Sequence, residues 1–159
     1  MTIRRAQTKD KKQLYKLFWG LHVGYHREDL LTGETAILAR YKNPKKTLKK
    51  EFDNYFKGKK YTIFVAEESK KLIGYICGSV QRKTGKVYNK EGHIEDLYIV
   101  KERRNKGVGT KLIEVMINEF SKLKCTHLSI ASYSQNIKAI SLYRRLGYKD
   151  HILILKKRF

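Results

Sequence analysis

The sequence predicts a single mixed α/β domain, residues 1–159, and three observations support this. The chain has 159 residues and a hydrophobic fraction of 41%, enough for one globular core. Runs rich in β-branched and aromatic residues alternate with amphipathic helical runs in the order βα(α)βββαβαβ. No linker and no internal repeat divides the chain.

The first part of the chain is expected to supply one strand and two helices. Residues 2–6 have the composition of a short strand, and Thr8 can cap the helix that follows. Residues 24–43 are poorly patterned and are expected to form a loop or a short helix. Pro44, the only proline, stands where the second helix can begin, and Gly58 can end it.

The rest of the chain is expected to supply five strands and two helices. Two β-rich runs flank the polar turn EESK as a hairpin, and a second turn at residues 84–86 leads to the next strand. A glycine-containing turn then opens a long amphipathic helix, and Gly147 can end the last helix. The predicted strands are residues 61–66, 72–80, 94–100, 127–131 and 148–155, and the last helix is residues 136–146.

The charge balance is strongly basic, but it does not decide the function. Lys and Arg number 36 against 15 acidic residues, a formal net charge of +21. Such an excess attracts polyanions such as nucleic acid, ribosomes or phosphorylated cofactors. Because the lysines are spread along the whole chain, a solvated surface with no dedicated partner explains the charge equally well.

The cysteines and the chain start indicate a cytoplasmic protein. Cys77 and Cys125 cannot build a disulfide framework, and no Cys/His cluster suggests a metal. The N-terminal stretch has no apolar signal region, and no segment approaches a membrane span.

The most informative stretch is Arg-Arg-Asn-Lys-Gly-Val-Gly-Thr, residues 103–110, between a strand and a helix. Glycine lets a backbone approach a ligand closely, and the first N–H groups of a helix form an anion site. A Walker loop is absent, and a dinucleotide fingerprint fails because its third glycine position is Leu112. Arg104, Gly107 and Gly109 instead fit R-x-x-G-x-G, and a plain strand-to-helix turn is the alternative.

A second motif strengthens the first. The stretch NIKAISLYRRLGY contains Asn136, Tyr143, Gly147 and Tyr148. Together the two motifs resemble the acetyl-coenzyme A site of the GNAT N-acetyltransferases, over residues 61–155, and are most similar to the polyamine and diamine branch. The resemblance implies a central, mostly antiparallel twisted sheet of six or seven strands with flanking helices. It also implies acetyl-CoA as cosubstrate and direct transfer to an amine, without a metal or a covalent enzyme intermediate.

By this resemblance, backbone N–H groups of the glycine turn hold the pyrophosphate, and the preceding strand lends backbone groups to the pantetheine arm. Ordinary sheet core is the competing role for the strand, and a helix N-cap is the competing role for Asn136. The implied cofactor contacts are Leu97, Tyr98, Ile99, Arg104, Asn105, Lys106, Gly107, Val108, Gly109, Thr110, Asn136 and Ala139.

The resemblance also implies two catalytic side chains. Tyr143 would protonate the departing thiolate, and the alternative is a core tyrosine. Glu95 matches an acidic residue of the polyamine branch and would take a proton from the amine, or a water chain would do so. Strand alternation puts Glu95 and Asp96 on opposite faces, although the β-bulge of the family can re-aim one of them. An exposed carboxylate is the alternative for Glu95.

The resemblance also implies that the loop after the first helix lines the acceptor pocket, which makes its acidic residues candidates for binding the amine. Glu28 and Asp29 would recruit a cationic amine together with Glu95. His22 and His26 lie four residues apart, but Gly24 stands between them and no acidic residue completes a metal set, so we expect surface or substrate-rim histidines.

Three functions remain open from the sequence. The favoured one is acetylation of a small amine or polyamine, although a charge of +21 repels a polycation at long range. The second is acetylation of protein N-termini, such as those of ribosomal proteins, or of lysines, with the basic surface docking on RNA. A basic nucleic-acid-binding module, with tyrosines interleaved among lysines, is the alternative of another class. A homodimer is a further expectation.

Overall fold

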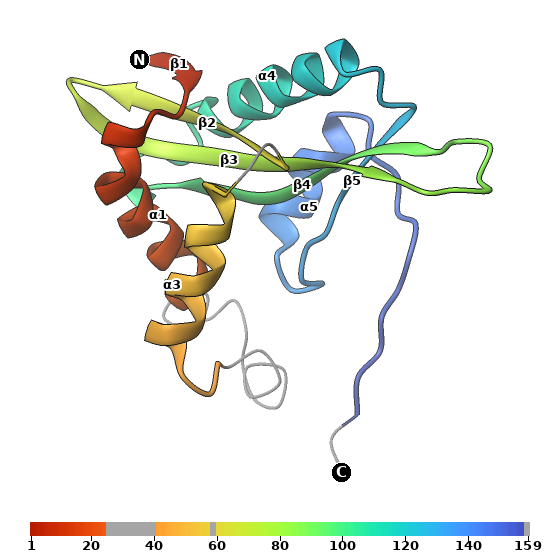
Figure 1. Cartoon of the computed structure of the whole chain (residues 1–159), viewed down its shortest axis with the longest axis horizontal. Coiled ribbons are helices and arrows are strands. Elements are labelled where there is room, and N and C mark those ends of the chain that lie inside the picture. The colour runs from red at the N-terminus through yellow and green to blue at the C-terminus, as the bar shows by residue number, and fades with distance from the viewer. Residues whose placement is uncertain (25–40, 58–59, 158–159) are drawn as a thin grey trace.

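The computed structural model describes residues 1–24, 41–57 and 60–157, and Figure 1 shows their arrangement. One sheet runs through the domain in the strand order β1-β2-β3-β4-β5. The first three pairings are antiparallel, and β4 pairs with β5 in parallel. The strands are β1 (Thr2–Arg5), β2 (Tyr61–Glu68), β3 (Lys71–Arg82), β4 (Lys90–Ile99) and β5 (His127–Ile130).

Helices cover both faces of this sheet. One face carries α1 (Lys11–Gly24) and α3 (Pro44–Tyr55), and the other carries α4 (Val108–Lys122), as Figure 1 shows. Phe18, Leu48 and Tyr75 are fully buried on the first face, and Ile76, Leu112 and Phe120 are fully buried on the second. The apolar stripes predicted for these helices therefore form two cores, one on each side of the sheet. The last helix, α5 (Ile137–Arg145), packs its Leu142 and Tyr143 against the α4-face core.

Most of the predicted boundaries are confirmed. Pro44 occupies the first turn of α3, and the Asn43 side chain caps that helix by accepting from the Lys46 N–H at 3.2 Å. Gly147 follows α5 with φ +90°, the left-handed conformation of a helix C-cap. The EESK turn joins β2 to β3 with Ser69 and Lys70 both at positive φ, as in the type I′ turns of tight hairpins. Gly58 and residues 25–40 lie outside the described residues.

Two predictions about the ends of the domain are wrong. Thr8 opens a short 3-10 turn (Thr8–Asp10) rather than capping α1, and the Asp10 carboxylate accepts from the Gln7 N–H at 2.7 Å. Residues 148–155 do not form a strand, so the sheet has five strands in the described part of the chain, not six or seven. Their β-rich composition reflects a preference for a sheet, but they pair with no strand of the described chain.

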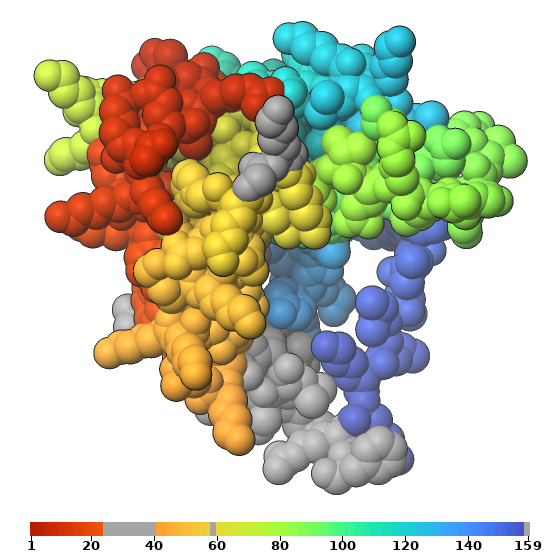
Figure 2. Space-filling view, viewed as in Figure 1, coloured from red at the N-terminus to blue at the C-terminus, as the bar shows by residue number. Residues whose placement is uncertain are grey.

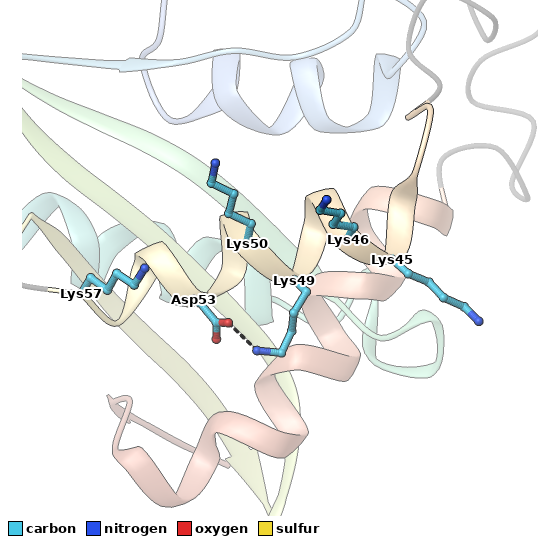
Figure 3. A pocket seen from close by; sticks show the side chains of 6 residues that line it. All are labelled: Lys45, Lys46, Lys49, Lys50, Asp53 and Lys57. Carbon is cyan, nitrogen blue, oxygen red and sulfur yellow. Dashed lines mark hydrogen bonds and ion pairs between the residues drawn. The ribbon is translucent and has the colours of Figure 1, made fainter.

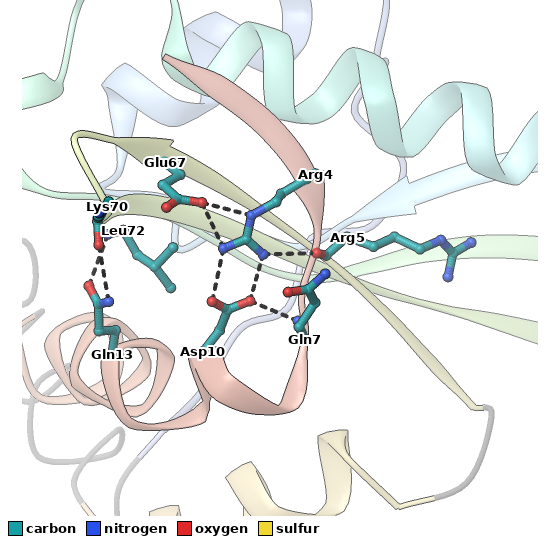
Figure 4. A network of polar contacts seen from close by, with 8 residues as sticks. All are labelled: Arg4, Arg5, Gln7, Asp10, Gln13, Glu67, Lys70 and Leu72. Atoms are coloured by element: carbon teal, nitrogen blue, oxygen red, sulfur yellow. Dashed lines mark hydrogen bonds and ion pairs between the residues drawn. The ribbon is translucent and has the colours of Figure 1, made fainter.

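A partly buried ion-pair network joins the start of the chain to the β2–β3 turn, as Figure 4 shows. Arg4 donates to both oxygens of Asp10, at 2.7 and 2.9 Å, and to Glu67 at 2.7 Å. The hydrogen bond from Arg4 holds the pKa of Asp10 below its ordinary value. Gln13 extends the network, because it accepts from the Leu72 N–H at 3.1 Å. This network fixes β1 and α1 against the sheet.

None of the helices within the described ranges combines the length and the apolarity needed to cross a membrane.

Candidate active site

The parallel strands β4 and β5 separate after a short stretch of pairing. Their register runs from Glu91 opposite His127 to Ile94 opposite Ile130. β4 then continues to Ile99 paired only with β3 among the described strands. The other edge of β4 from Glu95 onward is therefore open. An extended ligand with amide groups can hydrogen-bond to such an edge as an added strand.

A turn with left-handed residues connects the end of β4 to α4. Asn105 and Gly107 have φ +59° and +74°, and α4 begins at Val108. A Cβ atom on Gly107 would meet nothing within 4 Å, so the space above it is open. Because the first N–H groups of a helix have no intrahelical partner, this turn directs backbone donors and partial positive charge toward that open space. The geometry fits a phosphate group.

The second glycine serves packing rather than close approach of a ligand. A Cβ atom on Gly109 would lie 3.3 Å from Ile99 Cδ1 and 3.6 Å from Leu142 Cδ2. Gly109 therefore lets β4, α4 and α5 meet at one point. This contact brings the helix that carries Tyr143 next to the glycine turn.

The cations of the turn have different surroundings. Arg104 donates through Nε to the Ile99 carbonyl at 3.0 Å, and its guanidinium lies 5.7 Å from the centre of the Tyr98 ring. Arg103 donates through Nε to Glu68 at 2.8 Å, so much of its charge is already balanced. Lys106 is exposed beside Gly107. Lys106 and the backbone are thus the groups best placed to meet a phosphate.

The helix after β5 begins as the sequence predicts. Asn136 is the N-cap of α5, and its side-chain oxygen accepts from the Ala139 N–H at 3.4 Å. The N-termini of α4 and α5 thus follow the carboxyl ends of the two parallel strands, where α/β proteins commonly bind ligands. Tyr143 is half-buried, with its ring centre 6.2 Å from that of Tyr148.

A β-bulge in β4 brings both adjacent carboxylates to one face. Cys77 pairs with Asp96 and Gly78 pairs with Ile94, so Glu95 is the extra residue of β4. A Cβ on Gly78 would contact Phe120 and Met116, which places Gly78 toward α4. Its neighbours Cys77 and Ser79 therefore point away from α4, toward the α1/α3 face.

Glu95 and Asp96 both contact side chains of that α1/α3 face. The Ser79 hydroxyl donates to Glu95 at 2.6 Å, and Tyr75, two residues before Cys77, donates to Asp96 at 2.9 Å. The alternation expected from the sequence is therefore broken, and the expected bulge is present.

Glu95 has polar partners but remains accessible. Besides Ser79, it has His93 Nε2 3.8 Å away, and both side chains are 25% exposed. His93 Nδ1 lies 2.7 Å from the Ser129 hydroxyl of β5. A carboxylate, an imidazole and two hydroxyls thus lie near the point where β4 and β5 separate. Such a group can accept and pass on a proton.

Asp96 is buried, and its hydrogen bonds from tyrosines fall on one of its two oxygens. Tyr55 and Tyr75 donate to the same oxygen, Oδ2, at 3.0 and 2.9 Å. His22 Nε2 lies 3.5 Å from Oδ1, close enough for an ion pair but without hydrogen-bond geometry. Burial and the neighbouring Asp96 charge raise the pKa values of both tyrosines well above their ordinary value. These tyrosines stay protonated as donors.

Sequence reasoning missed most of this network. The sequence predicts a surface or rim position for His22, but this residue is largely buried between Phe18 and Asp96, with ring centres of His22 and Phe18 4.2 Å apart. Ser79, Tyr55 and Tyr75 carry no motif that could have pointed to them. The pair His93 and Glu95, two residues apart in a strand, was the one available signal. His26, Glu28 and Asp29 lie outside the described residues.

The two predicted catalytic side chains belong to opposite faces of the sheet. Tyr143 packs against the α4-face core, and Glu95 faces the α1/α3 side. The open edge of β4 lies between these faces. Within residues 1–24, 41–57 and 60–157 no group of three or more His, Cys, Asp or Glu side chains could hold a metal ion.

A basic hollow lies on α3, apart from the glycine turn. Its volume is about 520 Å³, and Figure 3 shows its lining. Asp53 pairs with Lys49 there, and with Lys11 of α1 at 3.1 Å. The other lining side chains are Lys45, Lys46, Lys50 and Lys57.

The fold and the site define a class of protein. A helix N-terminus with an open left-handed glycine, beside a strand with a free edge, suits an extended ligand that carries a phosphate. The model of the acetyltransferase (GNAT) family matches residues 14–148. The chain belongs to the GNAT acetyltransferase family.

Individual proteins agree with this assignment. An uncharacterised N-acetyltransferase of Methanocaldococcus jannaschii is 32% identical over 95 residues, which span 59% of this chain and 56% of that protein. The uncharacterised N-acetyltransferase YhfO of Bacillus subtilis is 27% identical over 94% of this chain and 91% of its own. A probable spermine N(1)-acetyltransferase of Bacillus subtilis subsp. natto is 33% identical over 38% of this chain and 42% of its own.

Solved structures share the fold. A predicted acetyltransferase from Clostridium acetobutylicum, crystallised with acetyl-CoA, superposes with a TM-score of 0.76 at 16% identity. The match covers 99% of this chain and 95% of that one.

Proposed function

We propose that the protein transfers an acetyl group from acetyl-CoA directly to a primary amine, and that the acceptor is a small amine or a polyamine. The observation that carries the proposal is the bulged Glu95 beside the open edge of β4. It sets a partly exposed carboxylate next to the edge where an extended cofactor arm would lie. The assignment of the protein to the GNAT family supports the reaction type.

The residues present fit acetyl-CoA. The open space at Gly107 and the N–H groups from Asn105 to Thr110 suit the pyrophosphate, with Lys106 adding charge. The backbone of Leu97, Tyr98 and Ile99 suits the pantetheine arm, because its edge has no strand partner in the described chain. When bound, acetyl-CoA supplies an acetyl group activated as a thioester. Asn136 and Ala139, in the first turn of α5, would flank the arm.

The protein's own groups handle the protons. A primary amine is mostly protonated at neutral pH and must lose a proton before it can react. Glu95 would accept that proton, while the Ser79 hydroxyl orients one of its oxygens at 2.6 Å. The Tyr143 hydroxyl would donate a proton to the leaving sulfur from the other face of the sheet. Glu28 and Asp29 would add negative charge to an acceptor pocket.

A second acceptor class, protein N-termini or lysines, is favoured by one observation. Five lysines surround the hollow on α3, with Asp53 as the single acidic lining residue. A surface of this kind attracts an acidic partner or the phosphates of RNA and repels a polycation. Such a partner could bind this surface and present its own peptide terminus or lysine to the active site.

The experiment that separates these acceptors is release of the CoA thiol from acetyl-CoA across a panel of amines. The panel contains spermidine, spermine, short diamines, an aminoglycoside and peptides with ribosomal-protein N-termini. Turnover of the small amines supports the first proposal, and turnover of peptides alone replaces it with the second. No turnover combined with no binding of acetyl-CoA would reject both, and salt-dependent RNA binding would then indicate a nucleic-acid-binding protein.

A matched pair of glycine variants tests the cofactor site without relying on activity. Gly107 and Gly85 have similar positive φ values, +74° and +79°, and a Cβ atom on either would meet nothing within 4 Å. Gly107→Val and Gly85→Val therefore suffer similar backbone strain, but only Gly107 lies in the α4 turn. We expect Gly107→Val to lose CoA binding, measured by calorimetry, while Gly85→Val keeps it. Equal affinities in both variants would remove the glycine turn from the site.

A further inference from the structure

The Lys60 ammonium lies over an aromatic ring on the face of the sheet that carries Glu95. Its Nζ is 5.0 Å from the centre of the Tyr61 ring, and an ammonium is attracted to the face of such a ring. The Tyr61 ring centre is 4.8 Å from that of Tyr55, and Tyr61 packs against the core of the α1/α3 face. Figure 2 shows the start of β2, in yellow, at the surface between α3, in orange, and the β3–β4 hairpin, in green.

A row of side chains across three strands connects Tyr61 to Glu95. Tyr61 of β2 stands directly opposite Ser79 of β3, and the side chains of opposite residues project on the same face about 5 Å apart. The Ser79 hydroxyl in turn donates to Glu95 of β4 at 2.6 Å. The Lys60 amine thus lies over the first member of a row whose last member is the Glu95 carboxylate.

The charge of Glu95 reaches the Lys60 ammonium. A hydrogen bond with Tyr61 and, to a smaller extent, the negative charge of Glu95 raise the pKa of Lys60. Exposed charges interact in this way only within about 10 Å at moderate salt, so the amine and the carboxylate lie within that range. The amine is protonated at neutral pH and, like the amine of any acceptor, needs a base before it can react.

We propose that Lys60 is an acetyl acceptor within its own chain, so that the protein acetylates itself at this residue. The proposal rests on the proposed function, because it uses the same acetyl-CoA and the same base, Glu95. Lysine has a flexible stem of four carbons, so the amine can swing from the Tyr61 ring toward Glu95. An acceptor that belongs to the chain is also present at a high effective concentration.

The transfer balances in atoms and charge. Lys60 Nζ forms a C–N bond to the carbonyl carbon of the acetyl group, the C–S bond of the thioester breaks, and the electron pair leaves on sulfur. Nζ gives up two protons: one passes through Glu95 to solvent, and the other replaces the proton that Tyr143 gives to the departing sulfur. Nothing is oxidised or reduced. The product is a neutral amide, so a positive charge that repels cationic acceptors is removed near Glu95.

Zero-length cross-linking tests the geometry without acetyl-CoA. A carbodiimide joins an amine to a carboxylate as an amide, with loss of water, only where the two groups come into contact. We expect a cross-link between Lys60 and Glu95 in the wild type, identified by peptide mass spectrometry, and none in Lys60→Arg. Lys11 and Asp53, 3.1 Å apart, provide the positive control. If that pair is joined and Lys60 is not joined to Glu95, the amine does not reach the base and the proposal is overturned.

Incubation with trideuterated acetyl-CoA tests the transfer itself, because the label distinguishes new acetyl groups from any already present. Lys71→Arg is the matched control, since Lys71 is exposed at the other end of the β2–β3 pair, opposite Glu68. We expect the wild type and Lys71→Arg to be labelled at Lys60, at a rate per chain that does not change on dilution. Lys60→Arg should lose this label, and Glu95→Gln should slow it at least about a hundredfold.

Three labelling results would overturn the proposal. Equal labelling of Lys60 and Lys71, or of the wild type and Glu95→Gln, would show chemical acetylation outside the site. A rate per chain that rises with protein concentration would show transfer between copies, and an unlabelled Lys60 would show no transfer to it. Turnover of small amines separates this last result from failure of the proposed function, because amines turned over while Lys60 stays unlabelled would leave the proposed function intact.

Discussion

Glu95 and Asp96 are neighbours on one strand and have the same charge, yet their surroundings differ. The Asp96 side chain is 5% exposed and accepts two tyrosine hydroxyls on a single oxygen. Glu95 is 25% exposed, accepts from one serine hydroxyl and has a histidine at 3.8 Å. A buried carboxylate that accepts hydrogen bonds from two elements holds those elements together, whereas a partly exposed one can still exchange a proton.

The difference arises from the bulge and from distant elements. Because Glu95 is the extra residue of β4, it turns to the same face as Asp96 but lies closer to β5. Tyr55 of α3 and Tyr75 of β3 then donate hydrogen bonds to Asp96, and the Ser79 hydroxyl donates to Glu95. The pair thus divides into a structural and a reactive member, and each prediction below tests that division.

The largest effect is expected for Glu95→Gln. The amide keeps the shape and can still accept the Ser79 hydroxyl, but it cannot take a proton from the amine. We expect turnover of the best amine from the panel to fall about a thousandfold, with CoA affinity unchanged. Glu102→Gln is the control, because this substitution makes the same change in charge and Glu102 is exposed in the turn after β4. Wild-type turnover in Glu95→Gln would mean that a water chain or another group accepts the proton.

Asp96 should affect stability instead of chemistry. Asp96→Leu leaves two buried tyrosine hydroxyls without an acceptor, which should cost about 3 kcal/mol in the free energy of unfolding. Asp96→Asn keeps an oxygen for both hydroxyls and should cost less than half as much. We expect turnover of Asp96→Asn to stay near that of the wild type. If Asp96→Asn loses activity as severely as Glu95→Gln, the two carboxylates share the reactive role.

The sequence predicted those features of the site that depend on neighbouring residues, and it missed those that depend on residues far apart in the chain. The glycine turn and the start of α5 were predictable, because the left-handed Gly107 and the N-cap Asn136 act through their own backbone and next few residues. The contacts of Asp96 were not, since Tyr55 stands 41 residues away and reaches it only after α3 has packed on the sheet. A strand pattern also cannot reveal which residue will be left unpaired in a bulge.

The last predicted strand shows a different limit. Residues 148–155 have the composition of a buried strand, but composition describes only the environment that side chains prefer. Whether that environment exists depends on a partner strand, and the described part of this chain supplies none for them.

Alkaline pH should lower the stability of the fold through Tyr55 and Tyr75, the two tyrosines that donate to Asp96. Burial holds the pKa values of Tyr55 and Tyr75 well above the ordinary value of about 10. A raised pKa in the folded state stabilises the fold fully below about pH 10, and this contribution is lost as pH rises further. Each tyrosine should then cost about 1.4 kcal/mol per pH unit above about pH 10. Unfolding followed by urea at about pH 9 and about pH 11 should show a smaller loss in Tyr55→Phe than in the wild type, and equal losses would contradict this account.

The smallest effect is expected for Tyr143→Phe. This variant tests whether Tyr143 donates a proton from the α4 face of the sheet while Glu95 accepts one on the opposite face. The ring packs against the α4-face core and Tyr148, so removing the hydroxyl should leave the fold and CoA binding intact. Loss of a proton donor to a thiolate should lower turnover by about tenfold, because a thiolate is a tolerable leaving group without help. The decisive measurement compares acetyl-CoA with an acetyl thioester of a more acidic thiol, for which protonation matters less. Tyr143→Phe should be slow with the first and near wild type with the second, whereas an equal deficit with both would make Tyr143 a packing residue.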